Sequence, residues 1–341
     1  GWFETGTLRM KGENVSNDSE IQDQGRQWRF SANASFFGAQ RDRFNEYQPA
    51  RTLDEKFELV AHVEGITGVE LKYPRDFGDV DHVRDLLDDY ELTLSAVNVN
   101  TKTSRLFQYG ALSARRAEAR RVAGERLREG MDLAADFGAE IVTTCPLAEG
   151  YDYPFQVDYA EAWGHFVETL RGVVSHRSDV SLVVEYQPHE PYAKILLTNV
   201  GKMLHVCAEV DAPNFGANLD VGHSFAAGES PAESAAMLHR KGWLRYIHTN
   251  DNTGEGGDWD MISGSVHFWD WLELLYTLER LGYDGWFSAD IQPKDFGPVR
   301  AYRANVVMIQ RMTAFLHRVG VDQIAALMSE ERRTPELYAY M

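Results

Sequence analysis

The sequence predicts an α/β protein, a (β/α)8 TIM barrel, and two observations favour that fold. Short apolar or β-branched runs alternate with helical patterns from about residue 30 to residue 320, and eight such runs can be distinguished. Several of these runs end in acidic residues or histidine, and the polar ends recur about every thirty to forty residues, the length of one strand-plus-helix unit. Because crossover helices join parallel strands, the alternation indicates a closed parallel barrel.

The individual elements have recognisable boundaries. Thr52 is a candidate N-cap, and the acidic residues Asp54 and Glu55 follow it, as at the start of many helices. A doubly wound open sheet is the alternative fold, but it needs a glycine-rich turn after its first strand, and residues 36–40 (Phe-Phe-Gly-Ala-Gln) do not form one. We expect the strands at Phe30–Phe37, Gly68–Tyr73, Leu94–Asn100, Ile141–Cys145, Leu182–Tyr186, Phe215–Asp220, Arg245–Thr249 and Trp286–Ile291. The main helices are expected after Thr52 and at Ser113–Phe137, Tyr159–Val174, Leu197–Val210, Pro231–Leu238, Trp269–Leu281 and Val299–Val319.

The two ends of the chain are expected to lie outside the barrel domain. Residues 1–28 are polar and predict an N-terminal arm. Residues 321–341 predict a C-terminal helical extension that packs outside the barrel or on a neighbouring subunit. Nothing resembling a low-complexity linker interrupts the middle of the chain, so residues 29–320 are expected to form one domain.

The composition excludes several classes of protein. A formal net charge of −18 argues against a nucleic-acid partner, which requires a clustered basic face. The two cysteines, Cys145 and Cys207, cannot build a disulfide framework, so a reducing, cytoplasmic location is expected. No run of about eighteen apolar residues is present, so we expect no membrane span, and the first residues do not predict a signal peptide.

Four candidate metal ligands fall at or near the ends of predicted strands: Glu185, Asp220, His248 and Asp290. The C-terminal ends of barrel strands converge on one face, so these side chains are expected to meet there. Unpaired buried carboxylates repel one another and must be neutralised, which a divalent cation does directly. Oxygen ligands together with imidazole suit manganese most closely, with cobalt or magnesium as alternatives.

A second group of candidate ligands lies beside the first. His223 follows Asp220 by three residues, and Asp258 and Asp260 lie in a glycine-rich loop after the seventh predicted strand. Alternate residues of an extended segment point the same way, so both carboxylates are able to hold one ion. The whole set contains five carboxylates, which fits two divalent ions.

The ligand segments resemble those of a known enzyme family. Residues 185–191 (Glu-Tyr-Gln-Pro-His-Glu-Pro) resemble the metal-binding segment of xylose isomerases, residues 220–223 (Asp-Val-Gly-His) their next ligand segment, and residues 258–260 (Asp-Trp-Asp) their paired-aspartate loop. The use of His248 and Asp290 on the last two strands is closer to L-rhamnose isomerases of the same superfamily.

The resemblance implies a xylose isomerase-like barrel over residues 30–320 and a two-metal site. One ion would be held by Glu185, Asp220, His248 and Asp290. The other would be held by His223, Asp258 and Asp260, with Asp220 bridging. It also implies a small-molecule sugar or sugar derivative as substrate and a homodimer or homotetramer.

Two departures from the family pattern bear on catalysis. The isomerases carry a lysine two residues after the fifth-strand glutamate, where this chain has Gln187, and a histidine at the end of the second strand, where it has Lys72. Lys72 on one strand end is a candidate replacement for the missing lysine on another. We therefore take Asp260, Lys72, His189 and Gln187 as candidate catalytic residues, and Cys145 as a lining residue.

The function that these residues favour is metal-dependent aldose–ketose isomerisation by a hydride shift. An epimerase, dehydratase or lyase of the same superfamily, including one that cleaves C-glycosides, is the alternative, and would abstract a proton next to a carbonyl. A non-catalytic sugar-binding protein is a third interpretation.

Overall fold

The computed structural model describes residues 27–255 and 257–341, so residues 1–26 of the expected N-terminal arm lie outside the described residues. Eight parallel strands close into a barrel in the order β1-β12-β11-β10-β8-β6-β5-β4. The predicted (β/α)8 fold is therefore confirmed. The barrel strands are β1 (Arg29–Asn33), β4 (Ile66–Tyr73), β5 (Thr93–Val99), β6 (Ile141–Thr144), β8 (Ser181–Glu185), β10 (Phe215–Asp220), β11 (Leu244–Thr249) and β12 (Trp286–Ala289).

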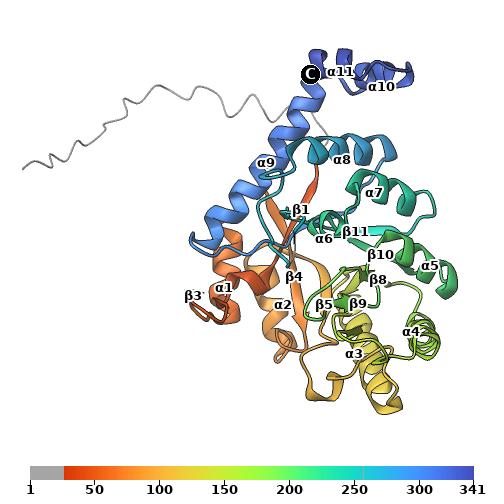
Figure 1. The fold of residues 1–341 in the computed structure, drawn as a ribbon. Helices are drawn as coiled ribbons and strands as arrows, with labels where there is room; N and C mark the ends of the chain where they lie inside the picture. Colours follow the sequence, from red (N-terminus) through yellow and green to blue (C-terminus); the bar gives the residue numbers. More distant parts are fainter. Residues whose placement is uncertain (1–26, 256) are drawn as a thin grey trace, which may run out of the picture. The chain divides into compact units, whose positions relative to one another are not determined.

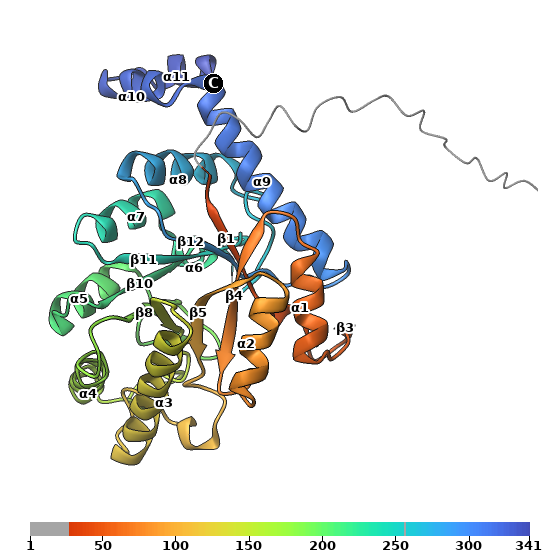
Figure 2. The same ribbon diagram turned by 180° about the vertical axis from the view of Figure 1, so that it is seen from behind.

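Helices surround the strands, as Figure 1 and the reverse view in Figure 2 show. Many of them begin at a side chain that caps the helix, and Thr52 with Glu55 forms a full capping box at the first. Their bounds are α1 (Leu53–Ala61), α2 (Val80–Asp89), α3 (Ala117–Asp136), α4 (Tyr159–Val174), α5 (Val200–Val210), α6 (Val221–Ala226), α7 (Pro231–His239), α8 (Phe268–Leu281) and α9 (Pro298–Val319).

Two short antiparallel sheets decorate the loops. One pairs β2 (Gln40–Arg41) with β3 (Glu46–Gln48), and the other pairs β7 (Gly150–Tyr151) with β9 (Lys194–Ile195). Both follow the C-terminal ends of barrel strands, so they belong to the face on which the candidate ligands were expected.

The first strand is shorter than the sequence predicted. It ends at Asn33, and residues 34–37 form a 3₁₀ helix instead of continuing to Phe37. The reason is local, because the Asn33 side chain accepts a hydrogen bond from the Ser35 amide and so begins a turn. The helix α2, which was not among the expected elements, begins at the N-cap Asp79.

The interior of the barrel is filled by side chains from five strands that form one buried cluster: Ala96, Ile141, Val183, Tyr246 and Trp286. Gly68 on β4 leaves room for the Trp286 ring, since a Cβ atom at Gly68 would lie 2.7 Å from that ring. Side chains alternate along a strand, so Glu70 and Lys72 share the inward parity of Gly68. This parity places the charged side chains of Glu70 and Lys72 inside the barrel, on the C-terminal side of the apolar cluster.

The N-terminal edge of the barrel includes Trp28, which was expected in the arm. Its ring stacks on Phe287 at 4.7 Å between centroids, and its indole nitrogen donates to Thr313 Oγ1 at 2.8 Å. The compact barrel unit spans Gln27–Thr313.

The chain continues after α9 into two short helices, α10 (Val321–Ser329) and α11 (Thr334–Tyr340). The Tyr340 hydroxyl donates to the Val319 carbonyl oxygen at 2.9 Å, which ties α11 to the end of α9. Across the described part of the chain, no helix has the length and apolar character that crossing a membrane requires.

Candidate active site and metal centre

The four strand-end candidates occupy the C-terminal face of the barrel. Glu185 and Asp220 are the last residues of β8 and β10, His248 is the last but one of β11, and Asp290 directly follows β12. Their side chains are between 0% and 14% exposed. Strand geometry thus delivers three carboxylates and one imidazole to one buried point.

His248 lies at the centre of this strand-end group. Its Nδ1 atom is 3.1 Å from Asp290 Oδ2, 3.2 Å from Glu185 Oε2 and 3.7 Å from Asp220 Oδ2. One ligand atom from each of Glu185, Asp220 and His248 lies within 4.8 Å of the others. These separations are those expected around a single ion.

The second histidine faces the same carboxylates from the other side. Asp220 caps α6 by accepting the His223 amide at 2.9 Å, and the cap sets His223 in the first turn of that helix. His223 Nδ1 is 2.9 Å from Glu185 Oε1 and 3.8 Å from Asp220 Oδ1, while Nε2 is 3.1 Å from Asp258 Oδ2. Glu185 and Asp220 therefore each direct one oxygen toward each histidine.

The paired-aspartate loop completes the cluster. Asp251 and Met261 exchange two backbone hydrogen bonds and close the base of the loop. Asp260 has a φ angle of 44°, a left-handed conformation that aspartate tolerates better than most residues. Asn250 connects the loop with the strand-end group, because its amide nitrogen donates to Asp220 at 2.9 Å and to Asp260 at 3.4 Å.

The electrostatics of the two histidines reflect the surrounding acids. Burial disfavours a charged His248, but nearby carboxylates, above all Glu70 and Asp290, outweigh it and raise the pKa of His248 well above its usual range. The pKa of His223 is likewise raised against burial, mainly by Asp220 and Asp258. Without a metal ion, the surrounding carboxylates therefore favour the protonated form of both imidazoles.

The pKa values of the carboxylates shift in opposite directions. Burial raises the pKa of Asp260 well above its usual range, with Asp258 and Asp290 adding to the effect. Burial also raises the pKa of Asp290. Burial acts against ionised Glu185 too, but the two histidines hold the pKa of this residue well below its ordinary value. The cluster thus holds more acids than its own cations can neutralise, which suits added positive charge.

The nitrogen atoms of both histidines fit metal coordination. His248 Nδ1 is buried and makes no hydrogen bond, although three carboxylates lie within ion-pair distance. The opposite nitrogen, Nε2, is 2.9 Å from Glu70 Oε2, so Nε2 carries a proton, and in the neutral imidazole that binds a metal the Nδ1 lone pair then faces the cluster. In His223 the roles are exchanged, since Nδ1 lies 3.0 Å from the Tyr186 carbonyl oxygen and Nε2 faces Asp258. A cation bound at His248 Nδ1 and a second cation bound at His223 Nε2 would satisfy both arrangements.

The candidate catalytic residue Lys72 lies on the barrel strand β4. Lys72 is half-buried at the end of β4. Burial, together with Lys102 and Arg75, lowers the pKa of Lys72 to about 8, while Asp290 and Glu70 act in the opposite direction. The structure thus puts this ammonium group within electrostatic reach of the cluster.

Gln187 and Cys145 form a contact beside the cluster. Gln187 is buried, and its Oε1 atom accepts from Cys145 Sγ at 3.6 Å. The sulfur atom lies within 4.8 Å of ligand atoms of Glu185 and His223. Burial raises the pKa of the Cys145 thiol far above its usual range, which favours the protonated thiol when no cation is bound. His189 is partly exposed in the loop after β8, and within the described residues no hydrogen bond or ion pair joins it to the cluster.

Glu70 is a site residue that the sequence pattern did not reveal. It is fully buried on β4, directly behind His248. The available signal was a carboxylate at an inward position of an otherwise mostly apolar strand, because a buried acid requires a partner. The partner itself, on a strand far away in sequence, was not visible in the local pattern.

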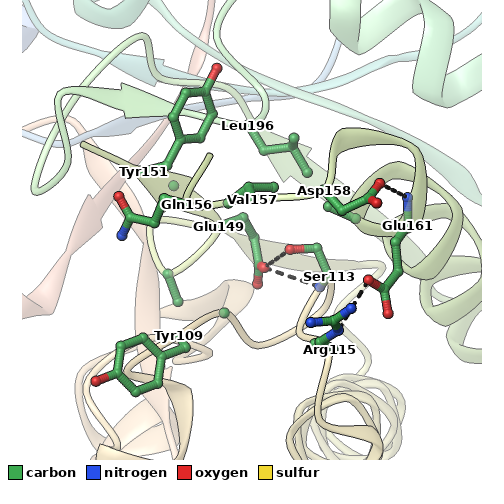
Figure 3. A pocket seen from close by; sticks show the side chains of 14 residues that line it. Tyr109, Ser113, Arg115, Glu149, Tyr151, Gln156, Val157, Asp158, Glu161 and Leu196 are labelled. Atoms are coloured by element: carbon green, nitrogen blue, oxygen red, sulfur yellow. Dashed lines mark hydrogen bonds and ion pairs between the residues drawn. The ribbon is translucent and has the colours of Figure 1, made fainter. Parts of the chain in front are cut away.

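A separate cavity of about 280 Å³ lies beside the β7–β9 sheet, and none of the cluster residues lines it (Figure 3). Tyr109, Tyr151, Gln156 and Glu149 are among the residues that line it. Glu149 is as deeply buried as Glu70, but its carboxylate accepts the amides of residues 111–113, with N–O distances of 2.6–3.0 Å. Glu149 thus fixes a loop and makes no contact with the cluster.

Comparisons with known proteins agree with this geometry. The family model of the xylose isomerase-like TIM barrel matches residues 57–312. Xylose isomerase from Thermus thermophilus is 28% identical over 253 residues, which cover 70% of this chain and 65% of that enzyme, slightly less than two thirds of its length.

Two solved structures share the fold at low sequence identity. A D-tagatose 3-epimerase-like protein has a TM-score of 0.63 and 19% identity, covering 89% of this chain and 100% of that chain. L-ribulose 3-epimerase has a TM-score of 0.61 and 17% identity, covering 89% and 99%. Since the family model matches well over half of the sequence, the chain belongs to the xylose isomerase-like TIM-barrel family.

Proposed function

We propose that this protein is a divalent-metal-dependent sugar isomerase that interconverts an aldose and a ketose by a hydride shift. The single observation that carries the proposal is the convergence of two histidines and five carboxylates at the barrel mouth, with Glu185 and Asp220 shared between the histidines. The name of the Thermus relative supports the reaction class. The substrate would be a small sugar or sugar derivative.

The residues that would hold metal divide into two groups. Glu185, Asp220, His248 and Asp290 would hold one ion, and His223, Asp258 and Asp260 the other, with Asp220 between them. Bound divalent cations would polarise two neighbouring substrate oxygens and stabilise negative charge on them. The mixture of carboxylate and imidazole ligands favours manganese, with cobalt or magnesium as alternatives.

The protein's own groups would orient the sugar and move its proton. Asp260, which would also bind the second ion, is the candidate proton carrier, because its buried carboxylate lies beside the strand-end group and accepts a hydrogen bond from Asn250 at 3.4 Å. Lys72 would hold a substrate oxygen through its ammonium group, which has no ion-pair partner among the described residues. The buried Gln187 amide offers a neutral hydrogen-bonding group where related isomerases have lysine. His189 would contact the substrate from the rim of the mouth.

An epimerase is the second candidate, and two observations favour it. The position of the isomerase lysine is taken by Gln187, and the solved structures with this fold include L-ribulose 3-epimerase and a D-tagatose 3-epimerase-like protein. In this reaction a base would remove a proton from the carbon next to a carbonyl, with Glu185 and Asp290 as candidates, both of which lie within 3.2 Å of His248 Nδ1. Dehydratase or lyase chemistry would begin with the same proton abstraction.

Turnover in deuterium oxide separates the two reactions. A panel of aldoses and ketoses is incubated with manganese-loaded protein, and the products are analysed by NMR, with metal-free protein as the control. A hydride shift keeps the migrating hydrogen inside the sugar, so the proposal expects almost no carbon-bound deuterium in the product. One deuterium per turnover at the reacting carbon would contradict the isomerase proposal and support the epimerase. Sugar binding without any turnover would support the non-catalytic alternative. The homodimer or homotetramer remains a prediction that sedimentation can measure.

A further inference from the structure

Glu70 supports the metal cluster from inside the barrel. Its carboxylate is fully buried and receives hydrogen bonds from three other strands. Oε2 accepts from His248 Nε2 at 2.9 Å and from Ser288 Oγ at 3.0 Å, and Oε1 accepts from Asn98 Nδ2 at 2.7 Å. All three partners are donors, which is the arrangement that an ionised carboxylate satisfies and a neutral side chain does not.

The stability of the fold by itself does not explain why a charged group occupies this position. Buried ion pairs often contribute less stability than well-packed apolar side chains of the same volume, because both charges lose their hydration. Glu70 therefore needs a role that an apolar residue on β4 lacks. The orientation of the His248 ring supplies such a role, since Glu70 contacts the ring nitrogen that faces away from the other carboxylates.

We infer that Glu70 is a positioning residue of the metal centre, which keeps the ring proton of His248 on Nε2 and so presents the Nδ1 lone pair to a divalent cation. The inference rests on the proposed metal-dependent function, and it concerns Glu70 alone. The Tyr246 ring meets the His248 ring edge-on, with 5.7 Å between centroids, and limits its rotation further. Glu70 and Tyr246 together leave the imidazole one productive orientation.

Glu70→Gln tests this role with little change in volume. A carboxamide has one acceptor oxygen and one NH2 group, so it cannot accept hydrogen bonds from His248, Ser288 and Asn98 together. If the NH2 group faces His248, it favours the ring proton on Nδ1, where the cation should bind. Loss of a residue that orients a metal-binding histidine typically reduces metal affinity by about 10–100-fold. We expect a reduction in this range for Mn²⁺.

Glu149→Gln provides the matched control. Glu149 is equally buried and also accepts several hydrogen bonds, but its donors are backbone amides of residues 111–113 and the Ser113 hydroxyl. It does not contact the cluster. This substitution should lower thermal stability and leave Mn²⁺ affinity within about twofold of the unsubstituted protein, which shows that loss of a buried carboxylate alone is not sufficient.

The experiment combines calorimetric titration with Mn²⁺ and ¹⁵N-histidine NMR of the Zn²⁺-loaded protein, with His248→Gln used to assign the His248 signals. The expected result is an Nε2–H form of metal-bound His248 in the unsubstituted protein, and weaker Mn²⁺ binding with loss or change of that signal in Glu70→Gln. Equal Mn²⁺ affinity and an unchanged Nε2–H signal in Glu70→Gln would overturn the inference. If the unsubstituted protein itself binds no Mn²⁺, the proposed function fails as well, which is a distinct result.

A second variant covers the case in which Glu70→Gln does not fold. Asn98→Ala removes one donor to Glu70 and leaves the carboxylate in place. It should loosen the carboxylate and weaken Mn²⁺ binding severalfold, with a mixture of the two ring tautomers of His248. Unchanged affinity and a single Nε2–H form in this variant would contradict the positioning role.

Discussion

The strand-end group and the loop group of the cluster, the latter formed by Asp258 and Asp260, are held in different ways. Asp220 and His248 lie on barrel strands, and their side chains are at most 1% exposed. Asp258 lies on the loop after β11, and its side chain is 26% exposed. Asp260 depends on a left-handed backbone conformation and on a pair of hydrogen bonds between Asp251 and Met261 at the base of the loop. One group is fixed by the barrel, and the other by a loop.

This difference suggests a division of labour. Residues on rigid strands hold their geometry without a ligand, whereas loop residues adjust more easily and tolerate substitution. The strand-end group should therefore bind its ion more tightly and contribute to the integrity of the barrel. The loop group should bind its ion more weakly and should determine the rate of turnover.

The largest effect is expected for Asp220→Asn, because Asp220 faces both histidines. Asparagine caps a helix as well as aspartate, so α6 should still form, but one of the two carboxylate oxygens becomes an NH2 group. Metal analysis should find neither site fully loaded, and turnover should be lost. Asp158→Asn, at the remote N-cap of α4, is the matched control and should keep both ions. Full loading of Asp220→Asn would show that the residue does not bridge.

A smaller effect on the fold is expected for the double variant Asp258→Ala with Asp260→Ala. Turnover should be lost because the second ion and the candidate proton carrier are removed together. The free energy of unfolding should stay within about 1–2 kcal/mol of the original, since the loop adds little to the core. Thermal unfolding followed by circular dichroism measures this, and collapse of the fold would mean that the loop is structural.

Lys72 predicts a pH dependence. Burial and the neighbouring Lys102 and Arg75 lower the pKa of Lys72 to about 8, and bound cations would lower it further. The ammonium charge is present below this pKa and is lost as the pH rises through it. We therefore expect kcat/KM to fall as the pH rises through about 8. Lys72→Arg keeps its charge at all these pH values and should lack this alkaline decline. An identical decline in the arginine variant would exclude Lys72 as its source.

The smallest effect is expected for Asn33→Ala. The Asn33 amide donates to Asp290 Oδ1 at 3.0 Å and orients that carboxylate at the edge of the strand-end group. Its loss should weaken binding of the first ion by about tenfold, at the lower end of the usual range for a residue that supports a ligand. A calorimetric titration of this variant gives the value, and an unchanged affinity would show that the barrel alone orients Asp290.

The sequence predicted the fold because its signals are local. Strand runs and helical patterns alternate in order, and ligands at strand ends converge in any parallel barrel, so the meeting of Glu185 with His248 followed from topology. The end of β1 was missed because a single Asn33 side chain begins a turn there. Glu70 was missed because its significance depends on His248, 178 residues away, and local patterns carry no information on such pairs. The roles of Asp260, Lys72, His189 and Gln187 remain predictions.

The proposed function requires two divalent ions at the barrel mouth, one held by strands and one by a loop. Titration of the metal-free protein with Mn²⁺ in a calorimeter, with the double variant Asp258→Ala and Asp260→Ala in parallel, measures both ions at once. We expect two ions per chain for the original protein and one, still tightly bound, for the double variant. No binding by the original protein, or the same single ion in both proteins, would contradict the two-ion site.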